Sequence, residues 1–333
     1  MHERTLAIDL AKEVFQVAVF DDRGKVTGQR RPRRNKLASL LANQPPSTVV
    51  MEACAGAHYW GRLARSYGHE VRLVAPQRVK PFRQGQKNDG NDSVAIGEAG
   101  LSPNTRLVGV KSIEQQELQA LHRWRERVKG NRQRVVNQTR ALLFEFGVVI
   151  GKSFASFGRR IPEVLEDGEN ELTPRVRAMV WEGYEEYRSL SGRLKALDEE
   201  IEQLCRSNPC AKRLMKELRG VGALSATALL CVMADPKAFK RGRQFSGLVG
   251  VVPRQHSSGD RVVHRGIKKG GQRYLRMLLV HGARSVISHL GDKQDPLSCW
   301  LRELVARRGK NVAAVALANK NARQAWAILS QMA

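Results

Sequence analysis

Four acidic residues in the first hundred positions have the types and spacing expected of a metal site. Asp9 and Glu52 each end an apolar segment, TLAID and TVVME, that is predicted to be a strand. An unpaired carboxylate is costly to bury at such a place. Asp89 and Asp92 lie three residues apart, a spacing that a helix places on one face. Together these carboxylates predict a cage for a hard divalent cation such as Mg²⁺, which prefers oxygen ligands.

Each of these acids also has an ordinary structural explanation. Asp89 or Asp92 could cap a helix, and Asp9 or Glu52 could form a salt bridge at the end of its strand. For any single acid, the two explanations are equally good. Four such acids in a strongly basic chain favour the metal site. Two ions there would stabilise the attacking and leaving oxygens of a phosphodiester reaction.

A serine pair in the last third of the chain is the candidate nucleophile. Ser257 and Ser258 precede Gly259, and a hydroxyl beside glycine in a cationic loop could attack a phosphodiester. Spacing alone favours the simpler explanation of a solvated Ser-Ser-Gly turn. We expect the basic residues around the pair to contact nucleic acid; they are Arg254, His256, Arg265, Lys268, Lys269, Arg273 and Arg276.

A Gly-x-Gly turn offers a second contact with nucleic acid. Gly220 and Gly222 lie between two predicted helices in the segment LRGVGALSA. Such a turn exposes backbone N–H groups at a helix N-terminus, where a phosphate can bind, as in helix-hairpin-helix motifs. The alternative is a turn between helices that needs glycine only for its backbone shape.

The charge of the chain supports nucleic acid as the partner. The 333 residues include 57 Lys and Arg but 32 Asp and Glu, which leaves a net charge of +25. Such an excess is typical of proteins that bind a polyanion. The densest basic segment, 237–276, contains eleven Lys or Arg and one acid, Asp260. A merely soluble basic protein is the alternative.

The cysteines and the N-terminus predict a cytoplasmic protein. The five cysteines form no CxxC pair and no Cys/His run with zinc spacing, which fits free thiols in a reducing compartment. The N-terminal segment MHERTLAIDL does not resemble a signal peptide, and no apolar run approaches the length of a membrane span.

The elements that must position these residues are predicted by hydrophobic patterning. Segments 5–10 and 14–20 indicate a β-hairpin, 48–51 and 70–74 indicate further strands, and a helix covers 59–65 between them. Strands that alternate with helices predict an α/β layer.

The rest of the chain is predicted to be helical, so the fold class is α/β plus α. Segment 112–206 contains two long helices, with a loop near 151–174, and indicates an antiparallel coiled-coil arm. An ordinary helical bundle fits the pattern equally well. Apolar helices follow at 274–290 and 311–331.

These features, in this order, resemble the DEDD-type transposases of the insertion-sequence family numbered one hundred and ten, including its eleven-eleven subgroup. The resemblance extends over essentially the whole chain. The segments that carry it are AIDLAKEVFQVAV, VVMEACAGAHYWGRLA, the pair Asp89-x-x-Asp92, and FSGLVGVVPRQHSSGD with HRGIKKGGQRYLRMLLVHGA.

The resemblance implies a RuvC-like, RNase-H-type domain at 1–111, a coiled-coil arm at 112–206 and a transposase domain with a helix-hairpin-helix-like motif at 207–333. It implies that the four acids bind metal and that the serine element forms a transient bond to DNA. We favour Ser258 as the nucleophile, with Ser257 still possible. It further implies dimers that assemble into tetramers and guidance by a structured bridge RNA.

This sequence departs from the family pattern around the aspartate pair. Asn88 precedes Asp89, Ser93 follows Asp92, and Gly90 weakens helix formation, so we expect the helix to begin near Asn91. Two other functions compete with a serine recombinase. One is a RuvC-like Holliday-junction endonuclease that uses a metal-activated water, and the other is a non-catalytic nucleic-acid-binding protein whose acids are structural.

Overall fold

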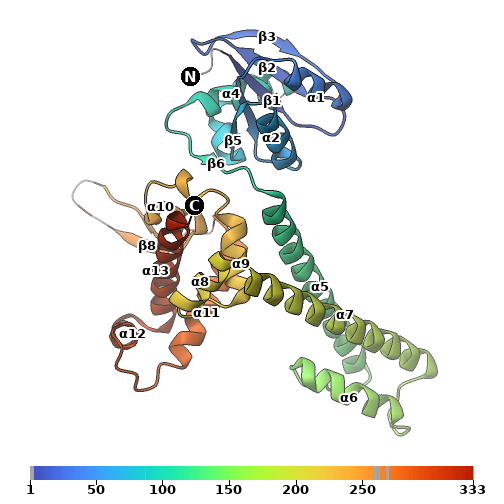
Figure 1. Ribbon diagram of the computed structural model, residues 1–333. Coiled ribbons are helices and arrows are strands. Elements are labelled where there is room, and N and C mark those ends of the chain that lie inside the picture. Colours follow the sequence, from blue (N-terminus) through green and yellow to red (C-terminus); the bar gives the residue numbers. More distant parts are fainter. Residues whose placement is uncertain (1–3, 87, 259–260, 262, 268–269, 333) are drawn as a thin grey trace.

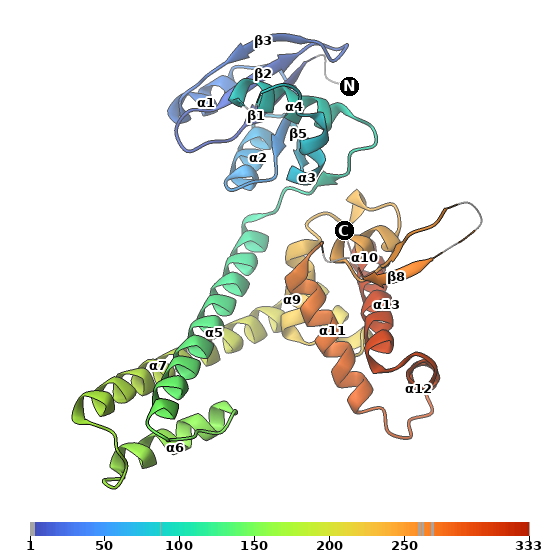
Figure 2. The same ribbon diagram turned by 180° about the vertical axis from the view of Figure 1, so that it is seen from behind.

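The computed structural model describes residues 4–86, 88–258, 261, 263–267 and 270–332. An N-terminal α/β domain, a long helical arm and a mainly helical C-terminal domain follow one another along the chain (Figures 1 and 2). Within these residues, no helix combines the length and apolar character needed to cross a membrane.

The N-terminal domain is built on a six-stranded mixed sheet in the order β3-β2-β1-β4-β5-β6. β1, β4 and β5 are parallel, whereas β2, β3 and β6 pair antiparallel with their neighbours. The strands are β1 (Thr5–Asp9), β2 (Gln16–Phe20), β3 (Val26–Arg30), β4 (Thr48–Glu52), β5 (Glu70–Val74) and β6 (Leu107–Val108). The predicted hairpin, the two further strands and the α/β layer are therefore confirmed.

Helices cover both faces of this sheet because side chains alternate along each strand. Leu6 and Ile8 face a core shared with α1 and α2, and Ala7 faces a second core shared with α4. The helical elements of the domain are α1 (Arg34–Ala42), α2 (Ala57–Ser66), α3 (Pro76–Val79), the 3₁₀ turn η1 (Lys80–Phe82) and α4 (Asp89–Leu101).

The arm consists of α5 (Ile113–Glu145) and α7 (Pro174–Ser207), which run in opposite directions, with α6 (Phe154–Glu166) between them (Figure 1). The predicted loop near 151–174 is thus wrong over most of its length. Ser153 caps α6, and the side chains of Phe157, Ile161 and Val164 repeat at helical spacing and are buried against α5 and α7. The far end of the arm is a three-helix cluster, whereas the middle is a two-helix seam at Val128, Leu190 and Leu194.

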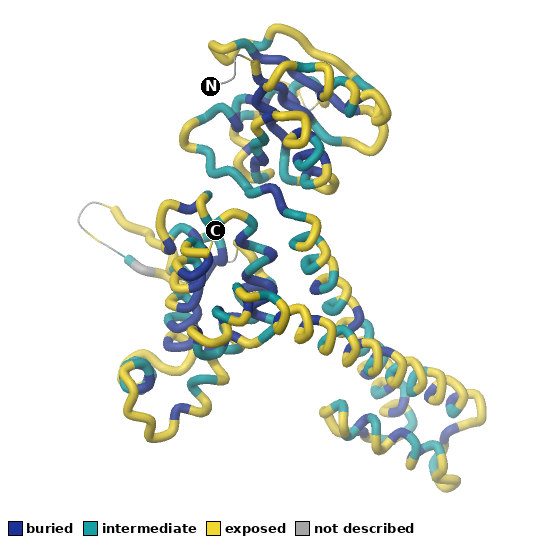
Figure 3. Tube along the Cα trace, viewed as in Figure 1, coloured by how far each residue is buried: buried dark blue, intermediate teal, exposed yellow. Residues whose placement is uncertain are grey.

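The C-terminal domain packs six helices around one apolar core, in which α9, α11 and α13 are central. A two-stranded hairpin, β7 (Pro253–Gln255) with β8 (His264–Ile267), projects from it. The helical elements are α8 (Pro209–Glu217), α9 (Ala223–Val232), the 3₁₀ turn η2 (Pro236–Ala238), α10 (Gly242–Val249), α11 (Arg273–Ser288), α12 (Pro296–Arg308) and α13 (Lys310–Gln331). Buried residues gather in the two end domains, and along the arm they alternate with exposed ones, following its seam (Figure 3).

Polar contacts join the start of α5 to the C-terminal domain. His122 is buried, its Nδ1 lies 2.9 Å from the Tyr274 hydroxyl, and its Nε2 lies 2.9 Å from Oγ1 of Thr227. Thr227 donates its hydroxyl hydrogen to the carbonyl of Ala223, so it accepts the hydrogen bond from His122. Burial, and secondarily Arg125, lowers the pKa of His122 to about 4, which keeps the ring neutral in this network.

Candidate active site

The parallel pairing of β1 with β4 brings the first two acids to one end of the sheet. Ile8 pairs with Met51, so Asp9 and Glu52, the next residues, end adjacent strands side by side. Both side chains are partly buried, because the strands lead out of an apolar core. The sequence prediction that these two carboxylates lie at adjacent strand ends is confirmed.

Helix α4 brings the other two acids over the same end. It begins at Asp89, two residues before the expected start near Asn91, because Oδ1 of Asn88 accepts a hydrogen bond of 2.8 Å from the Asn91 N–H. This cap compensates for the poor helix propensity of Gly90. The helix lies close to the sheet at Gly97, where a Cβ atom would come within 2.3 Å of the Phe20 ring.

The four carboxylates form one electrostatic cluster. The pKa of Asp9 is raised to about 6 by partial burial first, and then by the negative charges of Asp92, Asp89 and Glu52. Arg83, from the loop after η1, acts in the opposite direction and lowers this pKa. Acids that raise the pKa of one of their number repel one another when ionised. An added cation relieves that repulsion and is therefore stabilised at such a site.

Arg83 provides positive charge to the cluster. Its Nε lies 3.0 Å from Oδ1 of Asp92, and its Nη2 lies 3.6 Å from Oε2 of Glu52. No three His, Cys, Asp or Glu side chains among the described residues form a ready metal-ligand set. The donor set nevertheless fits a hard cation, since it consists of carboxylate oxygens and already attracts a guanidinium. A metal would require Arg83 to shift from at least one of its carboxylates.

The glycine turn joins α8 to α9, as predicted. Gly220 has a φ of +83° and packs so tightly on α11 that a Cβ there would lie 2.7 Å from the carbonyl oxygen of Gly282. Backbone shape therefore explains Gly220, which was one of the alternatives. Gly222 precedes the first residue of α9, is exposed and has open space around it. Contact of a phosphate with this helix N-terminus stays a prediction, and it rests on Gly222 more than on Gly220.

The serine element lies at the outer end of the β7–β8 hairpin. Ser258 forms an isolated β-bridge with Arg261, and both Ser257 and Ser258 are exposed. The backbone N–H of His256 donates to the carbonyl of Val263 at 2.9 Å, which continues the hairpin beyond β7. Gly259 lies outside the described residues. The serine pair is thus presented to solvent, as a nucleophile would have to be.

The predicted basic residues are placed around this hairpin to different extents. Arg254, His256, Arg265 and Arg273 are exposed on the hairpin or at the start of α11. Arg276 is partly buried, and its Nη1 donates to the carbonyl of Gly270 at 2.6 Å, so it also holds the end of the hairpin against α11. Lys268 and Lys269 lie outside the described residues.

The acids and the serines lie in different domains of one chain. In Figures 1 and 2 the hairpin projects from the C-terminal domain on the side away from the arm, and the acids belong to the N-terminal domain. Across the part of the chain that the structure describes, no hydrogen bond or ion pair links Ser258 to the acids.

Comparison with known proteins shows which family this chain resembles. Residues 6–147 match the model DEDD_Tnp_IS110, described as Transposase, and residues 212–296 match the model described as Transposase IS116/IS110/IS902 family. A transposase for insertion sequence element IS1111A of Coxiella burnetii is 39% identical over 98% of this chain and 90% of its own. A probable family 20 transposase of Pseudomonas aeruginosa is 41% identical over 99% of this chain and 98% of its own.

The chain belongs to the IS110 family of transposases. It is an enzyme that acts on DNA, and the charge of the chain had indicated a polyanion as its partner. A transposase for insertion sequence element IS1328 of Yersinia enterocolitica is also similar, at 35% identity over 98% of this chain. The family match over residues 6–147 contains all four acids, and the match over residues 212–296 contains the glycine turn and the serine pair.

Sequence reasoning missed Arg83 in this transposase. It lies nine residues before Asp92, in the basic segment RVKPFRQGQK that connects the end of β5 to α4. That segment begins four residues after the end of β5, and its Arg83 contacts acids at the ends of the parallel strands. The number of Lys and Arg residues between β5 and the aspartate pair would have suggested that one of them pairs with the acids, although not which one.

Proposed function

We propose that this transposase cleaves and rejoins DNA strands through a covalent serine–DNA intermediate, with Asp9, Glu52, Asp89 and Asp92 holding Mg²⁺. The observation that carries the proposal is the convergence of the four carboxylates at one sheet end, where partial burial, and then the charges of the other three acids, raise the pKa of Asp9 to about 6. A site of this charge favours a divalent cation and the phosphate that accompanies it.

The residues of the chain have separate roles in the proposed reaction. Bound Mg²⁺ supplies positive charge at the scissile phosphate. The acids would hold this ion in place, and Oγ of Ser258 attacks the phosphorus. An O–P bond forms to the serine, the bond from phosphorus to the 3′ oxygen breaks, and that oxygen leaves as a hydroxyl with the proton lost by the serine. Arg254 and Arg265 stabilise the charge that develops on the phosphoryl oxygens.

The serine and the acids are proposed to meet between protomers. Two features support a dimer that assembles into a tetramer. Ser258 lies on a hairpin that projects from the C-terminal domain, whereas Asp9 belongs to the sheet of the N-terminal domain. The far half of the arm exposes large apolar side chains, including Phe144 at 67% and Trp181 at 51% exposure, which a second copy would cover.

We further propose that a structured bridge RNA guides the reaction in the cytoplasm. The net charge of +25 is larger than the basic residues of the serine loop account for. The remaining basic residues provide surface for a second nucleic acid. This part rests on the resemblance to the family and on charge.

Trapping of the covalent adduct tests the mechanism. Wild-type protein is mixed with element-end DNA, Mg²⁺ and the non-coding RNA encoded beside the gene, and the reaction is stopped in denaturant. A denaturation-resistant protein–DNA band that disappears when Mg²⁺ is chelated is the expected result. Cleavage without any adduct would instead favour the junction endonuclease that uses water.

A further inference from the structure

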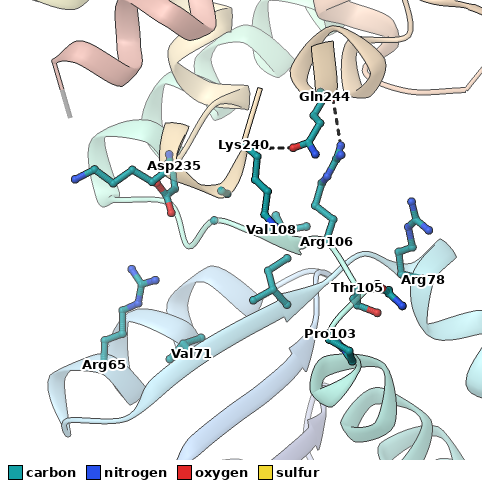
Figure 4. Close-up of a pocket in the computed structure, with 15 residues that line it drawn as sticks. Arg65, Val71, Arg78, Pro103, Thr105, Arg106, Val108, Asp235, Lys240 and Gln244 are labelled. Atoms are coloured by element: carbon teal, nitrogen blue, oxygen red, sulfur yellow. Dashed lines mark hydrogen bonds between the residues drawn. The ribbon is translucent and has the colours of Figure 1, made fainter. Parts of the chain in front are cut away.

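A cleft separates the edge of the N-terminal sheet from the C-terminal domain (Figure 4). It encloses about 570 Å³. One wall comes from β5, β6 and the residues that precede β6, and the other comes from η2, α10 and the segment between them. The proposed active-site residues do not line it.

Five cationic side chains line the cleft. Arg65, Arg78, Lys237 and Lys240 are exposed, and Arg106 is partly buried. Among the described residues, none of the five has a carboxylate partner within ion-pair distance.

The acid of the cleft is engaged elsewhere. Oδ1 of Asp235 accepts a hydrogen bond of 2.9 Å from the backbone N–H of Lys237, which caps η2. The carboxylate is thus used in local structure, and its single negative charge stands against the five cations, so the lining of the cleft stays positive. Positive charges brought together without an anion are unfavourable unless a ligand supplies one.

Arg106 holds the two walls in position. It lies just before β6, and its Nη1 donates to the carbonyl oxygen of Gln244 in α10 at 3.2 Å. Its guanidinium also lies 5.6 Å from the centre of the Phe239 ring. Burial, together with the charge of Arg78, lowers the pKa of Arg106. Within the described part of the chain, the side chains of Arg78 and Lys240 make no such contacts and remain available to a ligand.

We propose that this cleft binds the phosphodiester backbone of a nucleic-acid strand. Pockets for small organic ligands are mostly apolar, whereas this one is lined by cations, which match repeated phosphates. Arg78 follows the carboxyl end of β5, the parallel neighbour of the strand that ends at Glu52. The cleft therefore lies along the edge of the sheet whose parallel strands end at the acids. The proposal concerns binding alone and does not depend on the serine mechanism.

The first experiment measures how binding depends on salt. Arg78→Ala/Lys240→Ala is compared with wild type and with Arg23→Ala/Lys25→Ala, a matched pair of exposed cations in the turn between β2 and β3, at the opposite edge of the sheet. Fluorescence anisotropy is recorded against KCl with duplex DNA, single-stranded DNA and single-stranded RNA of one sequence. The slope of log K against log[KCl] should fall by about 1.8 for duplex and about 1.4 for single strands, which corresponds to two lost phosphate contacts.

The control pair should leave that slope unchanged. A reduced slope with only RNA or only DNA would show which nucleic acid the cleft binds. A reduced slope with every probe would show that the cleft binds any phosphodiester backbone. A slope equal to that of wild type with every probe overturns the proposal.

The second experiment uses wild-type protein and so does not depend on the folding of a variant. Surface lysines are acetylated with and without each oligonucleotide, and the modified sites are mapped by mass spectrometry. Lys237 and Lys240 should be protected by the probe that shows the reduced slope, and Lys25 should not. Equal acetylation of Lys237 and Lys240 with and without that probe overturns the proposal, even if the slope had changed.

Discussion

Nε of Arg83 lies 3.0 Å from Oδ1 of Asp92, so an arginine of the loop after η1 is paired with an acid of the candidate metal site. The contact shows that a cationic group already occupies the position beside this carboxylate. It also means that metal binding must compete with the guanidinium. The affinity for metal is therefore set by charge balance in the cluster, which depends on pH.

Metal affinity should fall as the pH drops through 6. Asp9 has a pKa of about 6, so below that pH it is mostly protonated and is lost as a ligand. Binding of Mn²⁺, followed by electron paramagnetic resonance, should be roughly fourfold weaker at pH 5.5 than at pH 7.5. Asp9→Asn should bind more weakly at both values and lose this dependence. An affinity that is constant across this range in the wild type would contradict the cluster as described.

Replacement of Asp92 by Asn should stop cleavage without stopping binding. The substitution keeps the shape of the side chain but removes a charge that the metal needs, and we expect strand cleavage to fall by at least roughly 100-fold. Affinity for DNA should stay within about twofold, because basic residues provide it. Asp22→Asn, at an exposed turn, is the matched control. Gel assays of cleavage and binding on the same samples measure both, and normal cleavage by the Asp92 variant would exclude the metal role.

Hydrophobic patterning predicted the sheet because each strand shows itself locally, as a short run of apolar residues. β1 and β2 pair as the expected hairpin, and Asp9 and Glu52 end parallel neighbours. The start of α4 was wrong by two residues, since the cap formed by Asn88 outweighs the poor helix propensity of Gly90. Helix α6 was missed although its Ser153 cap and the helical spacing of Phe157, Ile161 and Val164 are local signals, and Pro162 inside it disfavours a helix.

The candidate site was predictable only where spacing determines position. The carboxylates follow from strand ends and one helical turn, whereas Arg83 and the cleft between the domains depend on how separate elements pack. Arg106 contacts Gln244, 138 residues later, and no local pattern encodes such a pair.

Shortening the arm should separate oligomerisation from folding. Replacing residues 131–188 with a short Gly-Ser linker removes the exposed Phe144 and Trp181 but keeps the seam at Val128, Leu190 and Leu194. The contact of His122 with Tyr274 is also retained, so both end domains should stay folded. Light scattering should then report a monomer, and recombination should be lost. If the variant keeps the oligomeric state of the wild type, the arm is not needed for oligomerisation.

Neutral His122 should make stability depend on pH. Its pKa is about 4 in the folded chain and near 6.5 when unfolded, so the unfolded state binds more protons between these values. The stabilisation is complete above about pH 6.5 and is lost as the pH falls toward 4, by up to about 3 kcal/mol. His122→Gln keeps hydrogen-bonding groups but does not titrate, so its loss of stability between pH 7 and 4.5 should be smaller than that of the wild type. Equal losses in urea denaturation would mean that His122 is not the titrating group.

Variants of the serine pair test the nucleophile most directly. Ser258 and Ser257 are both exposed at the end of the hairpin, but Ser258 is the one directly before Gly259, and glycine is the residue type with the widest choice of backbone conformations. In the trapping assay, Ser258→Ala should give no adduct, and Ser257→Ala should give one. The Oγ of Ser257 lies 3.0 Å from Nε2 of Gln255, so its loss should disturb the hairpin only locally. Peptide mapping of the wild-type adduct locates the bond: attachment to Ser257 would move the assignment by one residue, and cleavage by the double Ser→Ala variant would show that a water, not a serine, attacks.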